Sequence, residues 1–257
     1  MPMPLNPPPL ARVIAIDTSR PTGSVAAYNP RQTPAAGQPA TASDAIDDAI
    51  FSETFNTPAD HSRLLAGGVE RTCRLAGWHP READLVGVVV GPGSFTGLRV
   101  GVTAAKVLAW ASGCRLVGIS AFDLLAHRCG SWVQRAWPEA ETLEIAFDAG
   151  RGEVHAATAT RSVAAAAGWQ VAPSRLLAAD AWSTSLAAGA IVVTPLVSEA
   201  LDGRSDLRRP PAELPHTTAA DTAMLAVQLA AAGHFAEAAT LTPEYLRPSY
   251  AEEPRRR

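Results

Sequence analysis

A continuous apolar run, Leu85–Val90, leads directly into a glycine-rich loop and then into a helix-forming segment that runs from Leu98 to about Ala111. A strand that is apolar at every position has both of its faces covered, as in a layered α/β structure. A second apolar run, Leu116–Ile119, follows this helix. The alternation of strands and helices predicts a sheet with helices packed against it.

Two segments, one in each half of the chain, have the pattern of a strand, a polar turn and a second strand. In the first half, Val13–Ile16 precedes a polar turn at Thr18–Gly23. In the second half, Leu143–Phe147 and Glu153–Thr160 flank a turn that is rich in glycine. Turn-forming residues between two β-forming runs predict a hairpin. Two similar hairpins, each with an Asp at its turn, suggest a duplicated fold.

We predict that the 257 residues form two lobes with short extensions. The first ten residues and a segment rich in Pro, Ala and Thr are predicted to be flexible. A helix is predicted at Thr218–Ala232, and it could pack back on the first lobe. The expected division is an extension at 1–10, a first lobe at 11–120 with an insertion at 29–47, a second lobe at 121–235 and a tail at 236–257.

The helix predicted for residues 61–76 has two adjacent glycines in its middle. Asp60 is its expected N-cap. Gly67 and Gly68 each cost about 1 kcal/mol relative to alanine in a helix. Close approach of another helix, from the same chain or from a partner, would offset that cost. The apolar stripe of this helix consists of Leu64, Leu65, Val69, Thr72, Cys73 and Ala76.

The loop that follows the buried strand contains three glycines, Gly91, Gly93 and Gly97, with Ser94 and Thr96 between them. Glycine permits close backbone approach, and the start of a helix offers free N–H groups. The loop could therefore hold a phosphate, or it could be a tight structural turn. It lacks the Lys-Ser/Thr of a Walker A loop, and its GxGxxxG spacing is one residue longer than the dinucleotide fingerprint. The spacing disfavours a nicotinamide enzyme.

Small polar residues follow the first strand of each hairpin. Asp17 precedes Thr18 and Ser19, and Asp148 precedes Gly150 by two positions. In some ATPases such loops hold a hydrated magnesium ion or phosphate oxygens, but the same residues also favour ordinary turns. Both interpretations stay open for these two loops.

Other chemistry finds little support in the sequence. His61 is followed four residues later by Leu65, so an HxxxH metal pair is absent, and Ser94 is not in a G-x-S-x-G elbow. The net charge of −3 disfavours a protein that binds nucleic acid without a partner subunit. The chain shows no signal-peptide pattern and no apolar run of membrane-spanning length, so we expect a soluble, cytoplasmic protein.

Five segments, in order along the chain, together resemble the TsaB (YeaZ) family. The most specific is GPGSFTGLR at Gly91–Arg99, and the others are Ile14–Ser19, His61–Leu65, Asp148–Val154 and Pro243–Arg247. The resemblance implies an actin-like ATPase (ASKHA) fold of two similar lobes. It also implies a non-catalytic subunit of the bacterial complex that forms N6-threonylcarbamoyladenosine at position 37 of tRNAs reading ANN codons. Gly150 and His155 depart from the family pattern, in which Arg and Tyr are usual.

The resemblance further implies TsaD as the catalytic partner, TsaE as an ATPase of the assembly, and a homodimer when the chain is alone. ATP and a metal ion are expected on the partner subunits, tRNA is expected only through the complex, and no cofactor or metal is expected on this chain. Gly68→Arg is expected to prevent the TsaD contact without unfolding the chain. The contact is assigned to His61, Leu64, Leu65, Gly67, Gly68, Val69, Thr72, Cys73, Arg99 and Val102.

The loops are expected to be vestigial nucleotide or phosphate loops, formed by Asp17, Thr18, Ser19, Gly91, Gly93, Ser94, Thr96, Gly97, Asp148 and Gly150. The alternative is a nucleotide-binding ATPase or small-molecule kinase of the same fold, in which Asp17, Asp148 and the Gly91 loop act on ATP. A protease is a weaker alternative, because no Ser/His/Asp or metal-ligand pattern supports it.

Overall fold

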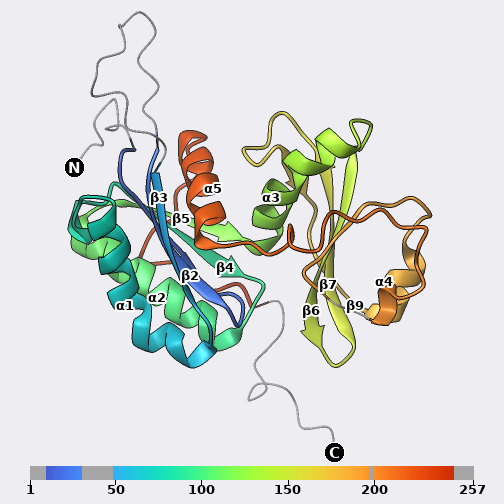
Figure 1. Ribbon diagram of the computed structural model, residues 1–257, viewed down its shortest axis with the longest axis horizontal. Helices are drawn as coiled ribbons and strands as arrows, with labels where there is room; N and C mark the ends of the chain where they lie inside the picture. Colours follow the sequence, from blue (N-terminus) through green and yellow to red (C-terminus); the bar gives the residue numbers. More distant parts are fainter. Residues whose placement is uncertain (1–9, 31–48, 197–198, 246–257) are drawn as a thin grey trace, which may run out of the picture.

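The computed structural model describes residues 10–30, 49–196 and 199–245, which form two α/β lobes side by side (Figure 1). The segments predicted to be flexible at the N-terminus and in the insertion lie almost wholly outside the described residues, as do residues 246–257 of the predicted tail. Within the described ranges, no helix has the length and apolar character needed to cross a membrane.

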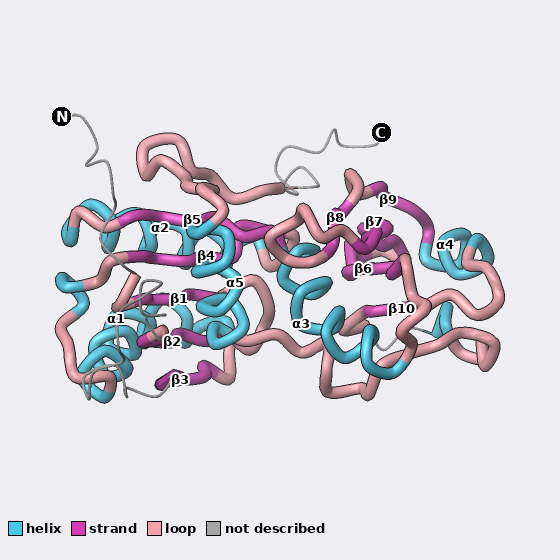
Figure 2. Tube along the Cα trace, turned by 90° about the horizontal axis from the view of Figure 1, so that it is seen from above, coloured by secondary structure: helices cyan, strands magenta, loops and turns pink. Residues whose placement is uncertain are grey.

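The first lobe is a five-stranded mixed sheet in the order β3-β2-β1-β4-β5, as Figure 2 shows. β1 pairs antiparallel with β2 and parallel with β4, while β3 and β5 form the two edges. The predicted hairpin and the predicted buried strand are therefore neighbours in one sheet. The strands are β1 (Val13–Asp17), β2 (Gly23–Asn29), β3 (Ala49–Phe55), β4 (Leu85–Gly91) and β5 (Arg115–Ser120).

Helices cover both faces of this sheet (Figure 1). Because successive side chains of a strand point to opposite faces, β1 contributes to two cores. Ile14 and Ile16 pack on the side of α1 and α2, whereas Val13 and Ala15 pack on the side of α5. These helices are α1 (Pro58–Leu75), α2 (Phe95–Ser112) and α5 (Ala219–Ala231), with a short 3-10 helix, η2, at Pro80–Glu82.

The second lobe has its own sheet, in the order β10-β6-β7-β8, with β9 also paired to β7. The β6–β7 pair is the second predicted hairpin. Leu125 and Val133 of α3 pack against Leu143 and Ile145 of β6. The elements are α3 (Ala121–Ala136), β6 (Thr142–Gly150), β7 (Glu153–Arg161), β8 (Trp169–Val171), β9 (Arg175–Ala178), α4 (Ala179–Ser185), β10 (Val192–Val193) and the 3-10 helix η3 (Glu199–Leu201).

The last part of the chain returns from the second lobe and packs on the first. The chain returns from β10 and η3 to α5, which packs on the first sheet (Figure 1). Residues 235–245, here named the C-terminal strap, then follow the edge strand β5 and reach the glycine-rich loop. The backbone N–H of Ala236 donates to the carbonyl of Leu116, and that of Glu244 donates to the carbonyl of Val90. The strap thus covers one edge of the sheet.

The α/β class with two lobes is confirmed, and α5 starts beside the predicted Thr218, but the starts predicted for the first two helices were wrong. α1 begins at Pro58, not after an N-cap at Asp60, and its N-cap residue is Thr57. Asp60 instead lies in the first turn, where it accepts from the Thr57 hydroxyl at 2.7 Å and a negative charge is also favourable. α2 begins at Phe95 because the Ser94 hydroxyl accepts from the Gly97 N–H at 3.2 Å.

Candidate functional site

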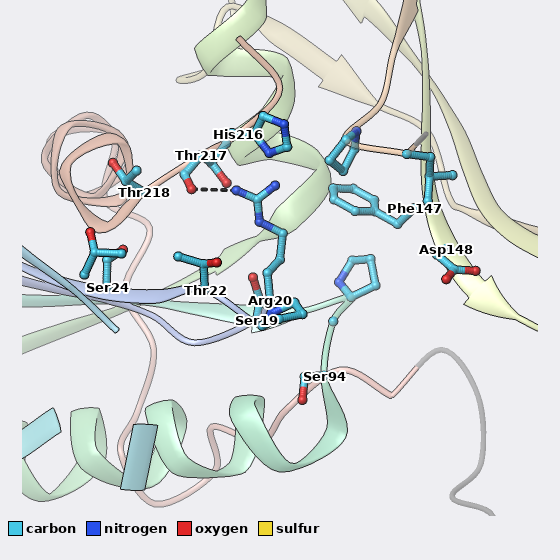
Figure 3. Close-up of a pocket in the computed structure, with 16 residues that line it drawn as sticks. Ser19, Arg20, Thr22, Ser24, Ser94, Phe147, Asp148, His216, Thr217 and Thr218 are labelled. Carbon is cyan, nitrogen blue, oxygen red and sulfur yellow. Dashed lines mark hydrogen bonds between the residues drawn. The ribbon is translucent and has the colours of Figure 1, made fainter. Parts of the chain in front are cut away.

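A pocket of about 770 Å³ lies between the two lobes (Figure 3). The first lobe contributes the β1–β2 turn, with Ser19 and Arg20, and the start of the glycine-rich loop, residues 92–94. The second lobe contributes Phe147 and Asp148 at the end of β6. The segment 216–218, which leads into α5, closes another side. Both predicted hairpin turns therefore reach one pocket.

Asp17 lies beneath the β1–β2 turn and does not line the pocket. Its side chain is buried, and its Oδ1 accepts from the Ser19 N–H at 3.0 Å and from the Ser19 hydroxyl at 2.6 Å. Burial raises the pKa of this carboxyl, and the two bonds from Ser19 oppose that effect. One carboxylate oxygen of Asp17 is thus directed to its own turn.

The glycine-rich loop packs directly against the same turn. The backbone N–H of Ser94 donates to the carbonyl of Ser19 at 2.6 Å, and the Thr18 hydroxyl donates to the carbonyl of Gly97 at 2.7 Å. A Cβ at Gly93 would overlap the backbone of Ser19, and a Cβ at Gly97 would overlap the carbonyl of Thr18. These two glycines are explained by close packing of protein against protein.

The remaining members of the predicted loops have separate positions. Gly91 lies under the strap, where a Cβ would be 2.5 Å from the carbonyl oxygen of Glu244. Thr96 is exposed in the first turn of α2. Asp148 is exposed, and its Oδ1 accepts from the N–H of Gly150 at 2.8 Å in the β6–β7 turn. Of the ten predicted loop residues, the pocket is lined by Ser19, Gly93, Ser94 and Asp148.

Sequence reasoning missed the residues that close the pocket. Arg20 projects across it, and its guanidinium donates to the carbonyls of Pro215 at 3.3 Å and Thr217 at 2.7 Å (Figure 3). Phe147 was assigned only to a strand, and the segment containing His216 was not assigned at all. The sequence around an arginine in a polar turn does not indicate that it bonds to a residue nearly two hundred positions away. No group of three or more His, Cys, Asp or Glu side chains suited to a metal occurs in the part of the chain that the structure describes.

Most of the side chains predicted to contact a partner are instead in the core of this chain. They include His61, whose Nε2 lies 3.1 Å from the carbonyl oxygen of Pro21 and supports the β1–β2 turn. Burial also raises the pKa of the Cys73 thiol to about 12, as expected for a core residue. Those buried are His61, Leu65, Gly68, Val69, Thr72, Cys73 and Val102; Leu64 and Gly67 are half-buried, and Arg99 is exposed.

The two glycines of α1 differ in their surroundings. A Cβ at Gly68 would lie 2.9 Å from Cζ of Phe55 and 3.1 Å from Cγ2 of Val25, both buried in the first lobe. A Cβ at Gly67 would lie 3.0 Å from Nη1 of Arg71, an exposed side chain whose Nε and Nη2 donate to Glu53. The expectation that Gly68→Arg leaves the fold intact was therefore wrong, because position 68 faces this chain's own β2 and β3.

Large apolar side chains are exposed on the outer surface of the same two helices. Trp110 and Val107 of α2 are 84% and 57% exposed, and Leu75 of α1 is 67% exposed. At the other end of α2, the Arg99 guanidinium lies 4.0 Å from the ring centroid of Phe95, and its Nε donates to the Tyr245 hydroxyl at 2.8 Å. We name the exposed surface of α1 and α2 the outer helix face.

Sequence comparisons place these features among known proteins. The profile of a family described as "TsaD: tRNA N6-adenosine threonylcarbamoyltransferase" matches residues 55–189, just over half of the chain. A Bacillus subtilis (strain 168) protein named tRNA threonylcarbamoyladenosine biosynthesis protein TsaB is 35% identical over 98 residues, which are 38% of this chain and 36% of the relative. The Escherichia coli (strain K12) protein of the same name is 27% identical over 144 residues, 56% of this chain and 53% of the relative. The chain thus spans about half or less of these curated relatives.

Solved structures share the fold over nearly the whole chain. One titled "YeaZ from Pseudomonas aeruginosa" has a TM-score of 0.65 at 22% identity, covering 92% of this chain and 100% of that chain. Another, titled "Crystal structure of an uncharacterized protein with similarity to peptidase YEAZ from Pseudomonas aeruginosa", has a TM-score of 0.66 at 24% identity with the same coverage. Together with the family profile, these likenesses confirm the two-lobed ASKHA-like fold.

The different surroundings of Gly67 and Gly68 predict opposite effects of alanine. Gly67→Ala should raise the free energy of unfolding by up to about 1 kcal/mol, because the helix gains propensity and only the surface Arg71–Glu53 pair has to adjust. Gly68→Ala gains the same propensity but presses on Phe55, and overpacking costs about 1–3 kcal/mol. Urea unfolding should therefore give a clearly lower free energy of unfolding for Gly68→Ala than for Gly67→Ala. Equal stabilities would contradict the packing of α1 on β2 and β3.

The raised pKa of buried Asp17 predicts a pH-dependent effect of neutralising it. The folded state favours the protonated form of this carboxyl. The protein is therefore most stable, as far as Asp17 is concerned, below the ordinary pKa of 3.8, and it loses this stability as pH rises through the raised pKa of the folded state. Asp17→Asn retains the acceptor oxygen without the charge. Its urea midpoint should exceed that of the wild type at about pH 7.5, and the difference should vanish at about pH 3. A difference that is the same at both pH values would show that the buried charge is not its cause.

Proposed function

Because the chain belongs to the tRNA N6-adenosine threonylcarbamoyltransferase family, and within it to the TsaB (YeaZ) group, we propose that it is a non-catalytic subunit in the formation of N6-threonylcarbamoyladenosine in tRNA. It binds and supports the catalytic subunit TsaD, and TsaE joins the assembly. ATP and the metal ion bind to the partner subunits, and tRNA meets this chain only within the complex. The site of action is the cytoplasm.

The observation that carries this proposal is the self-contained hydrogen bonding of the β1–β2 turn and the glycine-rich loop. Asp17 is bonded to Ser19, and the Ser19 carbonyl is bonded to Ser94. A general base must reach a substrate proton within hydrogen-bond distance, directly or through one water. Asp17 is buried, does not line the pocket and has one oxygen bonded within its own turn, so it is poorly placed for that task. The arrangement therefore supports a structural role for residues that could otherwise act on a nucleotide.

The outer helix face supports the second half of the proposal, which is the contact with TsaD. Exposed tryptophan is unfavourable in water, and tryptophan is strongly enriched among the residues that dominate binding energy at interfaces. Trp110, Val107 and Leu75 are the large apolar side chains exposed there, while the buried residues of the same helices pack against the sheet. We assign the TsaD contact to the exposed residues of this face, and the same face can pair two copies when TsaD is absent.

A reconstituted modification reaction tests this proposal. The cognate TsaD, TsaE and threonylcarbamoyl-adenylate synthase are combined with tRNA, ATP, threonine and bicarbonate, with and without this chain. Modification should require the chain. Trp110→Asp should lower both TsaD affinity and modification at least about tenfold, as expected for a dominant interface residue. Val163→Asp is the matched control, because Val163 is fully exposed in the second lobe and should have no effect.

Two results would overturn the proposal. Modification that proceeds equally well without the chain would remove its role in the reaction. Steady turnover of ATP by the isolated chain would favour the ATPase or kinase alternative. If Trp110→Asp and Val163→Asp both bind TsaD like the wild type, the subunit role stands and the outer helix face is the wrong surface.

A further inference from the structure

The pocket between the lobes contains a cation without a carboxylate partner. Arg20 donates to the carbonyl oxygens of Pro215 and Thr217. Among the described residues, no carboxylate lies within ion-pair distance of its guanidinium. Buried Asp17 acts on it only at longer range, and the exposed Asp148 lies at another wall of the pocket. A half-buried guanidinium that is bonded only to neutral carbonyls can exchange them for an anion, because charge-assisted bonds are the stronger ones.

The walls around Arg20 are held in place before any ligand arrives. Ser19 is fixed to the glycine-rich loop by the bond from the Ser94 N–H at 2.6 Å. Ser24, on another wall, accepts from the Ala219 N–H at 2.8 Å and so ties β2 to the start of α5. The N-caps of two helices, Ser94 of α2 and Thr218 of α5, also line the pocket. The positive end of the α2 dipole adds to the potential of Arg20, whereas the Asp221 carboxylate in the first turn of α5 offsets the dipole of that helix.

The rest of the pocket suits a flat apolar group. Figure 3 shows the ring of Phe147 beside the end of the Arg20 side chain. This ring is held from behind by Phe122, whose centroid is 5.0 Å away in an edge-on arrangement. Proline rings from both lobes line the same space, and the volume of about 770 Å³ is that of a small-molecule site.

We propose that this pocket binds a small organic anion with one charged head, a carboxylate or a phosphate, and a flat apolar body. The head bonds to Arg20 in place of the carbonyls of Pro215 and Thr217, and the body lies against Phe147. Because Arg20 is one cation and the Asp148 carboxylate lies on another wall, the pocket suits a ligand with one negative charge and disfavours a triphosphate. The proposal does not depend on the role in tRNA modification, since it concerns the isolated chain.

Ligand-observed fluorine NMR tests the site with 4-(trifluoromethyl)benzoate as the probe and its neutral amide as the chemical control. Wild-type chain should broaden the fluorine signal of the benzoate and not that of the amide. Arg20→Gln should weaken benzoate binding about tenfold or more, because a hydrogen bond to a charged group is lost. Arg175→Gln, which changes an exposed arginine on β9, should bind like the wild type.

Further measurements separate the possible results. Displacement of the probe by phenyl phosphate is compared with displacement by benzoate. The stronger competitor shows whether the pocket prefers a phosphate or a carboxylate group. Because the ligand contacts both lobes, saturating benzoate should raise the melting temperature of the wild type and not that of folded Arg20→Gln. Equal binding of benzoate and amide, wild-type affinity in Arg20→Gln, or no broadening with the wild type would each overturn the proposal.

Discussion

The rest of the first lobe depends on the contact between the β1–β2 turn and the start of α2. Thr18 and Ser19 lie directly against Gly93, Gly97 and Gly101, positions at which a Cβ would overlap the turn. This contact packs the start of α2 against the turn that follows β1. It also fixes one wall of the pocket, because the bond from Ser94 to Ser19 joins the loop to the turn. A side chain at any of the three glycines would separate these parts.

This contact accounts for where the chain can act. Within the first lobe, one oxygen of Asp17 is bonded to Ser19, and the Ser19 carbonyl is bonded to the glycine-rich loop. The features left for other molecules lie outside this contact, namely the exposed apolar residues of α1 and α2 and the pocket closed by Arg20. Asp17 is bonded within the first lobe, whereas Trp110 is exposed on its surface, where a partner can reach it.

The sequence allowed the two hairpins and the buried strand to be predicted, because turn-forming residues between β-forming runs and a continuous apolar run are local features. Helix starts were displaced, since Thr57 and Asp60 are both suited to an N-cap and only the fold selects between them. Gly68 was assigned to a partner contact because a glycine signals close approach but not the identity of its neighbour. Arg20 could not be found, because its acceptors at Pro215 and Thr217 are distant in sequence and are backbone carbonyls, which every residue has.

The central claim is that this chain supports modification of tRNA through its surface and not through the carboxylates of its two turns. The most direct measurement is the rate of tRNA threonylcarbamoylation by the reconstituted complex that contains the double variant Asp17→Asn, Asp148→Asn. Asparagine can keep the acceptor bonds to Ser19 and Gly150. The account predicts the wild-type rate. A fall of about a hundredfold or more, the loss expected when a general base is removed, would contradict it.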